Sequence, residues 1–312
     1  MKASWAGVFP AVTTKFKRDL SLDIDGMRAH FAWQIESGVD GLIVCGSVGE
    51  NSALSFDEKL AILRLALEVS SGRVPVLATV AENTTAEAIR AVEAGAKAGA
   101  DGFMVLPAMR YVSDRRETLT YYRTVAKVCA KPIMVYNNPV AYGVDVTPEM
   151  FAELADVAEL VAIKESSDNV RRITDLIDLT GTRYALFCGV DDLAMEAMLM
   201  GAVGWVAGLV NAFPGETVAI YRFIRDRRID DALAIYRWFS QLLHLDVSRK
   251  LVQNIKLVEA LAGVGSEFVR PPRLPLEGDE RARIEKTFAI AMQNRSTLPR
   301  LAAALRPRAL AT

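Results

Sequence analysis

Lys164 is the strongest candidate for a reactive residue in this sequence, because it ends a short apolar run that begins at Leu160. A run with valine and isoleucine that is bounded by a polar residue, here Glu165, predicts a buried strand. Burial disfavours the ammonium form of lysine and lowers its pKa. A lysine whose amine is free near neutral pH can attack a carbonyl carbon and form a Schiff base. Taken alone, the run also allows a lysine that reaches solvent at the strand end, so the rest of the chain must decide.

Two other segments supply groups that can move protons near such a lysine. Tyr136 ends the apolar run that starts at Pro132, and a phenol beside a Schiff-base lysine can relay protons to and from the substrate. A core tyrosine with a satisfied hydroxyl is the alternative. The turn at 46–50, Gly-Ser-Val-Gly-Glu, has glycines on both sides of two small residues. Its backbone amides can hold a carboxylate, and the Ser47 hydroxyl can pass a proton.

These groups need a scaffold, and strand-like and helical stretches alternate along the chain. Eight strand-like runs recur at intervals of roughly 20–35 residues, about the length of one strand-plus-helix unit. They lie at 8–12, 41–45, 74–80, 102–106, 132–136, 160–164, 184–188 and 204–209. Eight such units predict an α/β fold of the (β/α)8 TIM barrel type, with the active site at the carboxyl ends of the strands. An open doubly wound sheet is the alternative, but residues 7–15 carry no Gly-rich phosphate fingerprint.

Apolar spacing of three and four residues continues after the eighth run. It predicts further helices at about 214–225, 229–245, 248–261 and 278–293. These helices exceed what a bare barrel needs. We therefore expect a barrel over residues 1–225, followed by a C-terminal helical bundle over residues 226–312 whose last segment, 300–312, frays.

Composition excludes several classes of function. The 312 residues include 37 basic and 38 acidic side chains, and without a basic stripe we expect no nucleic-acid partner. No apolar run approaches the roughly 18 residues of a membrane span, and the first ten residues do not resemble a signal peptide. We therefore expect a cytoplasmic protein with no membrane partner. With two histidines and three widely spaced cysteines, a histidine triad is effectively excluded and no metal site is expected.

Three motifs together resemble the dihydrodipicolinate synthase / N-acetylneuraminate lyase family. They are Gly-Ser-Val-Gly-Glu at 46–50, Tyr-Asn-Asn-Pro at 136–139 and Lys-Glu-Ser-Ser at 164–167. Their order and spacing match the family, and the similarity runs from about residue 7 to residue 214. The resemblance implies class I, metal-independent chemistry through a lysine Schiff base with a 2-oxo acid. It also implies a (β/α)8 barrel, no cofactor and a homotetramer.

The resemblance assigns roles to individual residues of this chain. Lys164 is the expected Schiff-base lysine, Tyr136 the proton-relay and positioning tyrosine, and Ser47 the relay hydroxyl. The amides of Ser47 and Val48 are expected to hold the substrate carboxylate, and Gly189 and Val206 to line the pocket. Further substrate contacts are expected from Gly49, Arg110, Tyr111, Asn138 and Ala141.

Departures from the family pattern bear on the substrate. Synthase members carry an arginine for a second acidic substrate where this chain has Ala141, and they have adjacent tyrosines where 107–111 reads Pro-Ala-Met-Arg-Tyr. Val48 also replaces a threonine. These changes disfavour lysine-biosynthetic condensation. The apolar residues Val140, Ala141 and Met109 disfavour neuraminate, whose glycerol tail needs polar partners. A smaller 2-oxo acid or a cyclic imine is the expected substrate.

The best specific candidate comes from Tyr-Asn-Asn-Pro together with the run 142–149, Tyr-Gly-Val-Asp-Val-Thr-Pro-Glu. Both look like members that deaminate and dehydrate 1-pyrroline-4-hydroxy-2-carboxylate in hydroxyproline breakdown. Three alternatives stay open. One is an aldolase of the pyruvate type, acting on a 2-keto-3-deoxy acid or 4-hydroxy-2-oxoglutarate; the second is 4-hydroxy-tetrahydrodipicolinate synthase; the third is a ligand-sensing protein without turnover.

Overall fold

Eight parallel strands form the barrel at the centre of the computed structural model, which describes residues 5–108 and 110–299. Their hydrogen-bonded order is β1-β8-β7-β6-β5-β4-β3-β2, and a parallel bridge between Ala11 and Ile43 joins β1 to β2. The strands are β1 (Gly7–Pro10), β2 (Leu42–Val44), β3 (Val76–Val80), β4 (Gly102–Val105), β5 (Ile133–Asn137), β6 (Leu160–Glu165), β7 (Ala185–Cys188) and β8 (Gly204–Ala207). The predicted (β/α)8 fold is confirmed, and each predicted run overlaps one strand.

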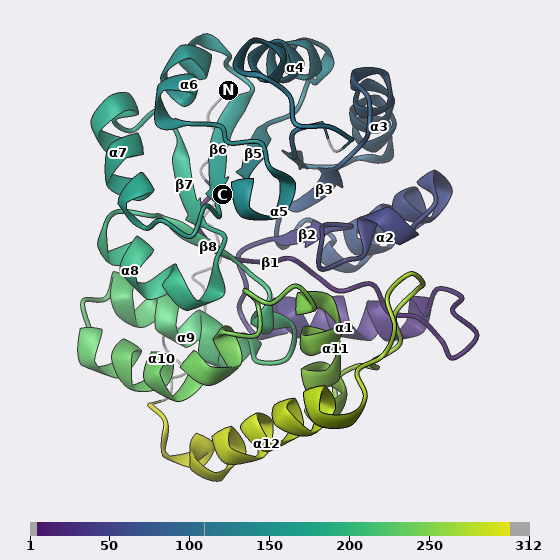
Figure 1. Cartoon of the computed structure of the whole chain (residues 1–312), viewed down its shortest axis with the longest axis vertical. Helices are drawn as coiled ribbons and strands as arrows, with labels where there is room; N and C mark the ends of the chain where they lie inside the picture. The colour runs from purple at the N-terminus through teal and green to yellow at the C-terminus, as the bar shows by residue number, and fades with distance from the viewer. Residues whose placement is uncertain (1–4, 109, 300–312) are drawn as a thin grey trace.

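Helices surround the barrel, as Figure 1 shows. Because the strands are covered on both faces, their residues are almost all buried, which explains the continuous apolar runs of the sequence. The helices of the barrel are α1 (Ile24–Glu36), α2 (Phe56–Ser70), α3 (Thr85–Ala98), α4 (Arg115–Val128), α5 (Pro139–Tyr142), α6 (Pro148–Glu153), α7 (Arg171–Thr180), α8 (Ala194–Leu199) and α9 (Pro214–Arg225). Within the described residues, no helix combines the length and the apolar character that a membrane crossing requires.

Local signals explain where several elements begin. Ser55 and Asp114 open α2 and α4 with capping boxes: the cap side chain accepts from the backbone N–H of the glutamate three residues later, and that glutamate's side chain accepts from the backbone N–H of the cap residue. The predicted run 74–80 narrows to a strand from Val76, because Pro75 has no N–H to donate to the ladder.

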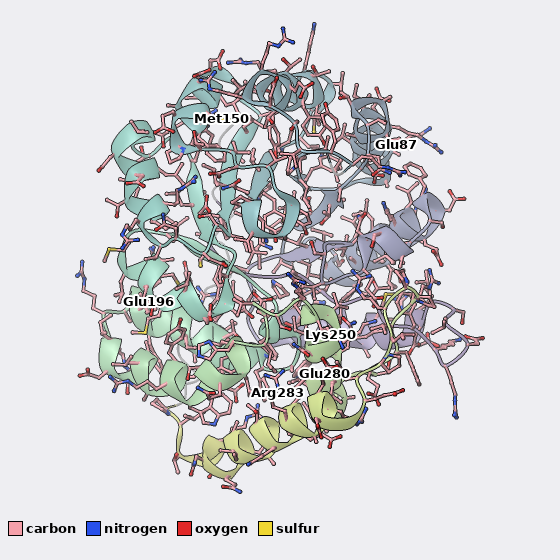
Figure 2. The ribbon with its side chains drawn as sticks, viewed as in Figure 1. Glu87, Met150, Glu196, Lys250, Glu280 and Arg283 are labelled. Carbon is pink, nitrogen blue, oxygen red and sulfur yellow. The ribbon has the colours of Figure 1, made fainter. Side chains whose placement is uncertain are left out.

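Three more helices follow the barrel: α10 (Ile229–Leu243), α11 (Leu251–Leu261) and α12 (Gly278–Asn294). In Figure 1 they lie together below the barrel, with α12 in yellow at the edge of the molecule. Trp238 Nε1 on α10 donates to the carbonyl of Ala291 on α12 at 2.7 Å. Lys250, just before α11, pairs with Glu280 on α12 at 2.5 Å, and Figure 2 labels both side chains. The division into two domains at residue 225 stays a prediction.

Helix α11 is also attached directly to the barrel mouth through buried ion pairs. Lys256 Nζ lies 2.5 Å from Glu50 Oε1, and both side chains are fully buried. Lys15, in the loop after β1, pairs with Glu259 in the same way. The C-terminal helices therefore hold the loops after β1 and β2, which border the site described next.

Candidate active site

A cavity of about 550 Å³ opens at the carboxyl ends of the strands. This volume is within the roughly 300–1,000 Å³ of small-molecule sites, and the location is where barrel enzymes place their chemistry. Residues from several strand ends and from the loop between α10 and α11 line it. Of the residues predicted from the sequence, the wall contains Ser47, Val48, Tyr136, Asn138, Ala141, Lys164, Gly189 and Val206.

Lys164 lies on β6 with its ammonium-bearing end in this cavity, and only 6% of the residue is exposed. Three lysines are buried among the described residues. Lys15 and Lys256 form ion pairs with carboxylates, whereas Lys164 has no such partner within 4 Å in that part of the chain. Burial lowers the pKa of Lys164, opposed by the negative charge of Asp246. The lowered pKa favours the free amine over the ammonium form.

Gly189, at the end of β7, makes room for this lysine. A Cβ atom at position 189 would lie 2.5 Å from Lys164 Cε and 2.0 Å from Ser166 Oγ. Both distances are far below van der Waals contact, so any side chain here displaces the lysine or the serine. Ser166 Oγ is buried without a hydrogen-bond partner among the described residues, and it faces the same cavity.

Tyr136 lies beside Lys164 because β5 and β6 are neighbours and the two residues are in register. The Lys164 Nζ is 3.9 Å from the centroid of the Tyr136 ring. Burial raises the pKa of Tyr136 to about 12, so its phenol stays protonated at neutral pH. The hydroxyl accepts a hydrogen bond from Asn138 Nδ2 at 3.1 Å. The phenol can therefore donate a proton beside the amine.

Tyr142 is a functional candidate that the sequence prediction missed. It is at the end of the one-turn helix α5, which Asn138 caps and Pro139 begins. Its hydroxyl is hydrogen bonded to Ser47 Oγ, and its ring meets the Tyr136 ring edge to face at 5.9 Å between centroids. Burial raises the pKa of Tyr142 as well. Proline and glycine four residues apart, at 139 and 143, were the available signal for this turn.

Contacts on the side away from the cavity hold the turn at 46–50 in place. Glu50 has a left-handed backbone with φ of 57°, and its carboxylate accepts from Lys256 Nζ at 2.5 Å and from the Arg270 amide at 3.0 Å. Gly49 lies behind the cavity wall: its carbonyl accepts from Thr14 Oγ1 at 2.6 Å, and it does not line the cavity. Its role as a substrate contact stays a prediction.

The two residues predicted from the loop after β4 lie elsewhere. Arg110 and Tyr111 are exposed, Tyr111 by 56%, and neither is part of the cavity wall. Their predicted contact with substrate is not made within this chain and stays a prediction. Met109, which was expected at the mouth, lies outside the described residues.

Two acids near Lys164 are not among the predicted site residues: Asp191, which is buried, and Asp246, which is partly exposed. Asp191 follows β7, and its carboxylate accepts from Trp205 Nε1 at 2.9 Å and from the Gly208 and Leu209 amides at 3.0 and 2.7 Å. Asp246 comes from the loop between α10 and α11 and lines the cavity. No local motif marks Asp246, because its position depends on how the C-terminal helices pack.

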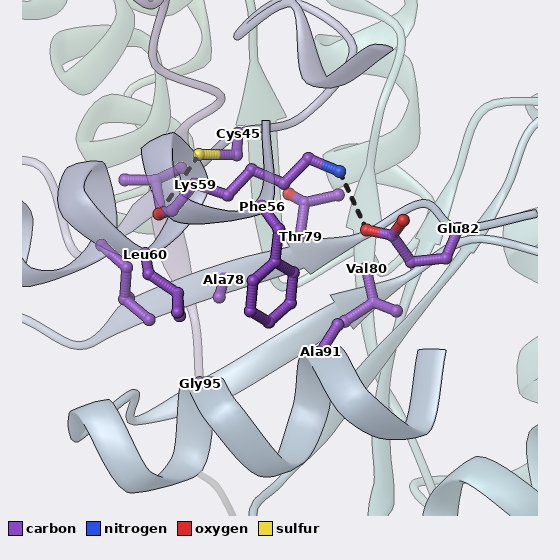
Figure 3. A pocket seen from close by; sticks show the side chains of 12 residues that line it. Cys45, Phe56, Lys59, Leu60, Ala78, Thr79, Val80, Glu82, Ala91 and Gly95 are labelled. Atoms are coloured by element: carbon purple, nitrogen blue, oxygen red, sulfur yellow. Dashed lines mark hydrogen bonds and ion pairs between the residues drawn. The ribbon is translucent and has the colours of Figure 1, made fainter. Parts of the chain in front are cut away.

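A second hollow lies between α2, α3 and the strands β2 and β3, where Figure 3 shows Lys59 paired with Glu82. The two atoms of this ion pair are 2.9 Å apart. The volume of this hollow is about 30 Å³, which holds about one water molecule. A 2-oxo acid does not fit there, so the larger cavity is the candidate site.

Comparisons with known proteins show the family and the fold of this chain. A model described as the dihydrodipicolinate synthetase family matches residues 4–291. A 4-hydroxy-tetrahydrodipicolinate synthase from Methanothrix thermoacetophila is 30% identical over 279 residues, which are 89% of this chain and 94% of that protein.

YagE from E. coli K12, a prophage protein of the dihydrodipicolinic acid synthase family solved in complex with pyruvate, is 30% identical. Its TM-score is 0.87, with 93% of this chain and 99% of that one covered. The synthase structure from Methylacidiphilum fumariolicum SolV has a TM-score of 0.91 at 23% identity, with 94% of this chain and 98% of that one covered, and shares the fold.

Proposed function

Because the chain belongs to the dihydrodipicolinate synthetase family of lyases, we propose that its Lys164 forms a Schiff base with a small 2-oxo acid or a cyclic imine. The supporting observation is that Lys164 is buried in the cavity without the ion pair that Lys15 and Lys256 have. A buried, unpaired lysine is costly to the fold, and a free amine aimed into a cavity is what carbonyl attack requires.

The steps follow from the side chains around the amine. The neutral Lys164 amine adds to C2 of the substrate, and C2 then releases water from a 2-oxo acid or the ring nitrogen, as an amine, from a cyclic imine. The resulting iminium draws electrons from the neighbouring carbon. Tyr136 supplies and recovers protons at the carbinolamine, while Ser47 and Tyr142 connect it to the partly exposed mouth of the cavity. The amides of Ser47 and Val48 hold the substrate carboxylate.

The specific reaction we propose is deamination and dehydration of 1-pyrroline-4-hydroxy-2-carboxylate. The cavity wall includes the apolar side chains of Val140, Ala141, Val206 and Leu251. Ala141 stands where resemblance to the synthases would call for an arginine. A small ring with one carboxylate suits this wall better than a substrate with a second carboxylate next to position 141.

Two observations support alternative reactions, which the experiment must therefore distinguish from the proposed one. The Methanothrix relative is named a 4-hydroxy-tetrahydrodipicolinate synthase, and YagE was solved with pyruvate, which a condensing enzyme or an aldolase of the pyruvate type would use.

The products distinguish these reactions. The purified protein should release ammonia and a semialdehyde from the hydroxylated pyrroline. Pyruvate plus an aldehyde from a 2-keto-3-deoxy acid, or condensation of pyruvate with aspartate semialdehyde, would instead favour a rival. Binding without any turnover would favour the ligand-sensing alternative. The Lys164→Ala variant should lose whichever activity the parent has.

We also propose that the protein is a cytoplasmic homotetramer, as resemblance to the family implies. Large apolar side chains such as Val112, Leu199 and Met200 are about half exposed or more, which favours burial against another copy. Light scattering should give a mass about four times the 34.1 kDa of one chain; a mass of one chain would contradict this.

A further inference from the structure

Asp246 brings a carboxyl group to the cavity from outside the barrel. It lies in the loop between α10 and α11, and it lines the same wall as Lys164. The Asp191 amide donates to its Oδ2 at 3.3 Å. Its Oδ1 is so close to Gly208 that a Cβ atom there would lie only 2.7 Å away. The carboxyl is thus seated at the end of β8, among the groups that surround the amine.

Asp246 and Asp191 are close to one another but differ in the number of hydrogen bonds that their carboxyl groups accept. Asp191 accepts three N–H bonds, from Trp205, Gly208 and Leu209, which favour its ionised form. Asp246 has one long backbone bond and no other partner among the described residues. Burial raises the pKa of both acids, and the pKa of Asp246 rises well above its ordinary value because the Asp191 charge adds to the effect. Of two neighbouring acids in unequal surroundings, the one with fewer hydrogen bonds to its ionised form is the better proton donor.

We propose that Asp246 is the general acid that protonates the departing hydroxyl when the intermediate on Lys164 loses water. This assignment deepens the proposed function and rests on it. It makes the site a dehydrating one, because C–C cleavage releases no hydroxyl and needs no acid at that place.

The step balances without a further reactant. The Schiff base loses a proton from C3 to the hydroxyl relay of Tyr136, Ser47 and Tyr142, which gives an enamine. The enamine electron pair then forms the C3–C4 double bond as the C4–O bond breaks. Its electron pair leaves with oxygen, and the proton of Asp246 completes a water molecule. The new carboxylate recovers a proton from the relay through solvent in the cavity, so no net charge is gained or lost.

Two assays on the same protein separate this role from that of Lys164. Exchange of the pyruvate C3 protons for deuterium, followed by NMR, needs the Schiff base and the enamine but no leaving hydroxyl. Ammonia release from the hydroxylated pyrroline needs both. In Asp246→Asn, ammonia release should fall by about 10²–10⁴, the range for loss of a general acid, and this loss should exceed any loss of exchange by at least about tenfold.

The matched control is Asp192→Asn, which removes a neighbouring negative charge without altering the cavity wall, because Asp192 pairs with His244 instead. It should stay within about threefold in both assays. Unchanged ammonia release in Asp246→Asn would overturn the assignment. An equal loss of exchange and release would overturn it too, because Asp246 would then act on Lys164.

The same two assays on the unsubstituted protein distinguish a failure of the Asp246 proposal from a failure of the proposed function on which it rests. A parent that exchanges pyruvate protons but releases no ammonia would overturn the role of Asp246 and leave the Schiff base standing. A parent that exchanges no protons would overturn the proposed function, and the role of Asp246 with it.

Discussion

At the scale of single residues, the three buried lysines differ in what surrounds them. Lys256 and Lys15 are neutralised by Glu50 and Glu259. Lys164 has only the more distant charges of Asp246 and Asp191, and its burial dominates. A buried charge without a partner is among the costliest features of a fold. The same burial that costs stability therefore supplies the reactive amine.

This contrast predicts opposite effects on stability for two identical substitutions. Lys164→Met removes an unpaired amine, so the free energy of unfolding should stay the same or rise, while turnover is lost. Lys256→Met leaves the Glu50 carboxylate buried without its partner and should cost about 3–5 kcal/mol. Urea unfolding of both variants measures this. A large loss of stability in Lys164→Met would mean that the amine is paired after all.

The pH dependence of the free energy of unfolding tests whether burial lowers or raises the pKa of Lys164. The pKa of Lys164 is lowered from 10.5 in the folded protein, so the unfolded chain binds more protons between the lowered pKa and 10.5. The stability of the parent should therefore rise with pH across that window. Lys164→Met lacks this contribution, and its stability advantage should shrink as pH approaches 10.5. An advantage that grows with pH would show that the pKa is raised.

The hydroxyls of Ser47 and Tyr142 share one hydrogen bond, so their removal should not be additive. We expect Ser47→Ala and Tyr142→Phe each to lower kcat by about 10²-fold, within the range for proton transfer. The double variant should be little worse than either single variant. If the two losses in kcat multiply, the residues act independently and Tyr142 is not part of the relay.

At the scale of elements, β6 and β7 set the space around the reactive lysine. Gly189→Ala places a methyl group 2.5 Å from Lys164 Cε, so either the lysine or the end of β7 must move. We expect a loss of at least about 10²-fold in kcat, because misplacement by about 1 Å has such effects. Ala162→Gly on the same strand as the lysine is a control for a change in backbone freedom. Full activity in Gly189→Ala would mean that the lysine works in another position.

The sequence predicted the elements well where the signal is local. Each of the eight strands overlaps a predicted run, although β1 begins one residue earlier and β5 and β6 end one residue later. The agreement arises because strands that are covered on both faces have continuous apolar sequences. Helix α6 begins at Pro148, because proline is favourable at the first position of a helix. Lys164, Tyr136 and Ser47 could be placed in one cavity because each follows or ends a strand.

Residues placed by packing between distant elements could not be predicted in this way. Tyr142 belongs to the site only because α5 turns its ring against Ser47, which is 95 positions away in sequence. Asp246 reaches the cavity through the packing of α10 and α11 on the barrel. Gly49 was expected at the surface of the site, but its carbonyl accepts a hydrogen bond from the Thr14 side chain. Neither periodicity nor a motif records such contacts.

At the scale of the whole molecule, the C-terminal helices take part in the site and do not merely follow the barrel. Helix α11 fixes the turn that carries Ser47 through the Glu50–Lys256 pair, and the loop before it supplies Asp246. The barrel provides the amine and the phenol. The complete set of groups exists only when both parts are folded together, so truncation after α9 should remove activity even where the barrel persists.

The measurement that tests the central claim most directly is borohydride reduction in the presence of pyruvate, followed by intact-protein mass and peptide mapping. We expect one reduced pyruvate adduct per chain, located on Lys164 and absent in Lys164→Met, while Lys15 and Lys256 stay unmodified. If neither pyruvate nor the hydroxylated pyrroline leaves an adduct, or if the adduct maps to another lysine, Lys164 is not the Schiff-base residue.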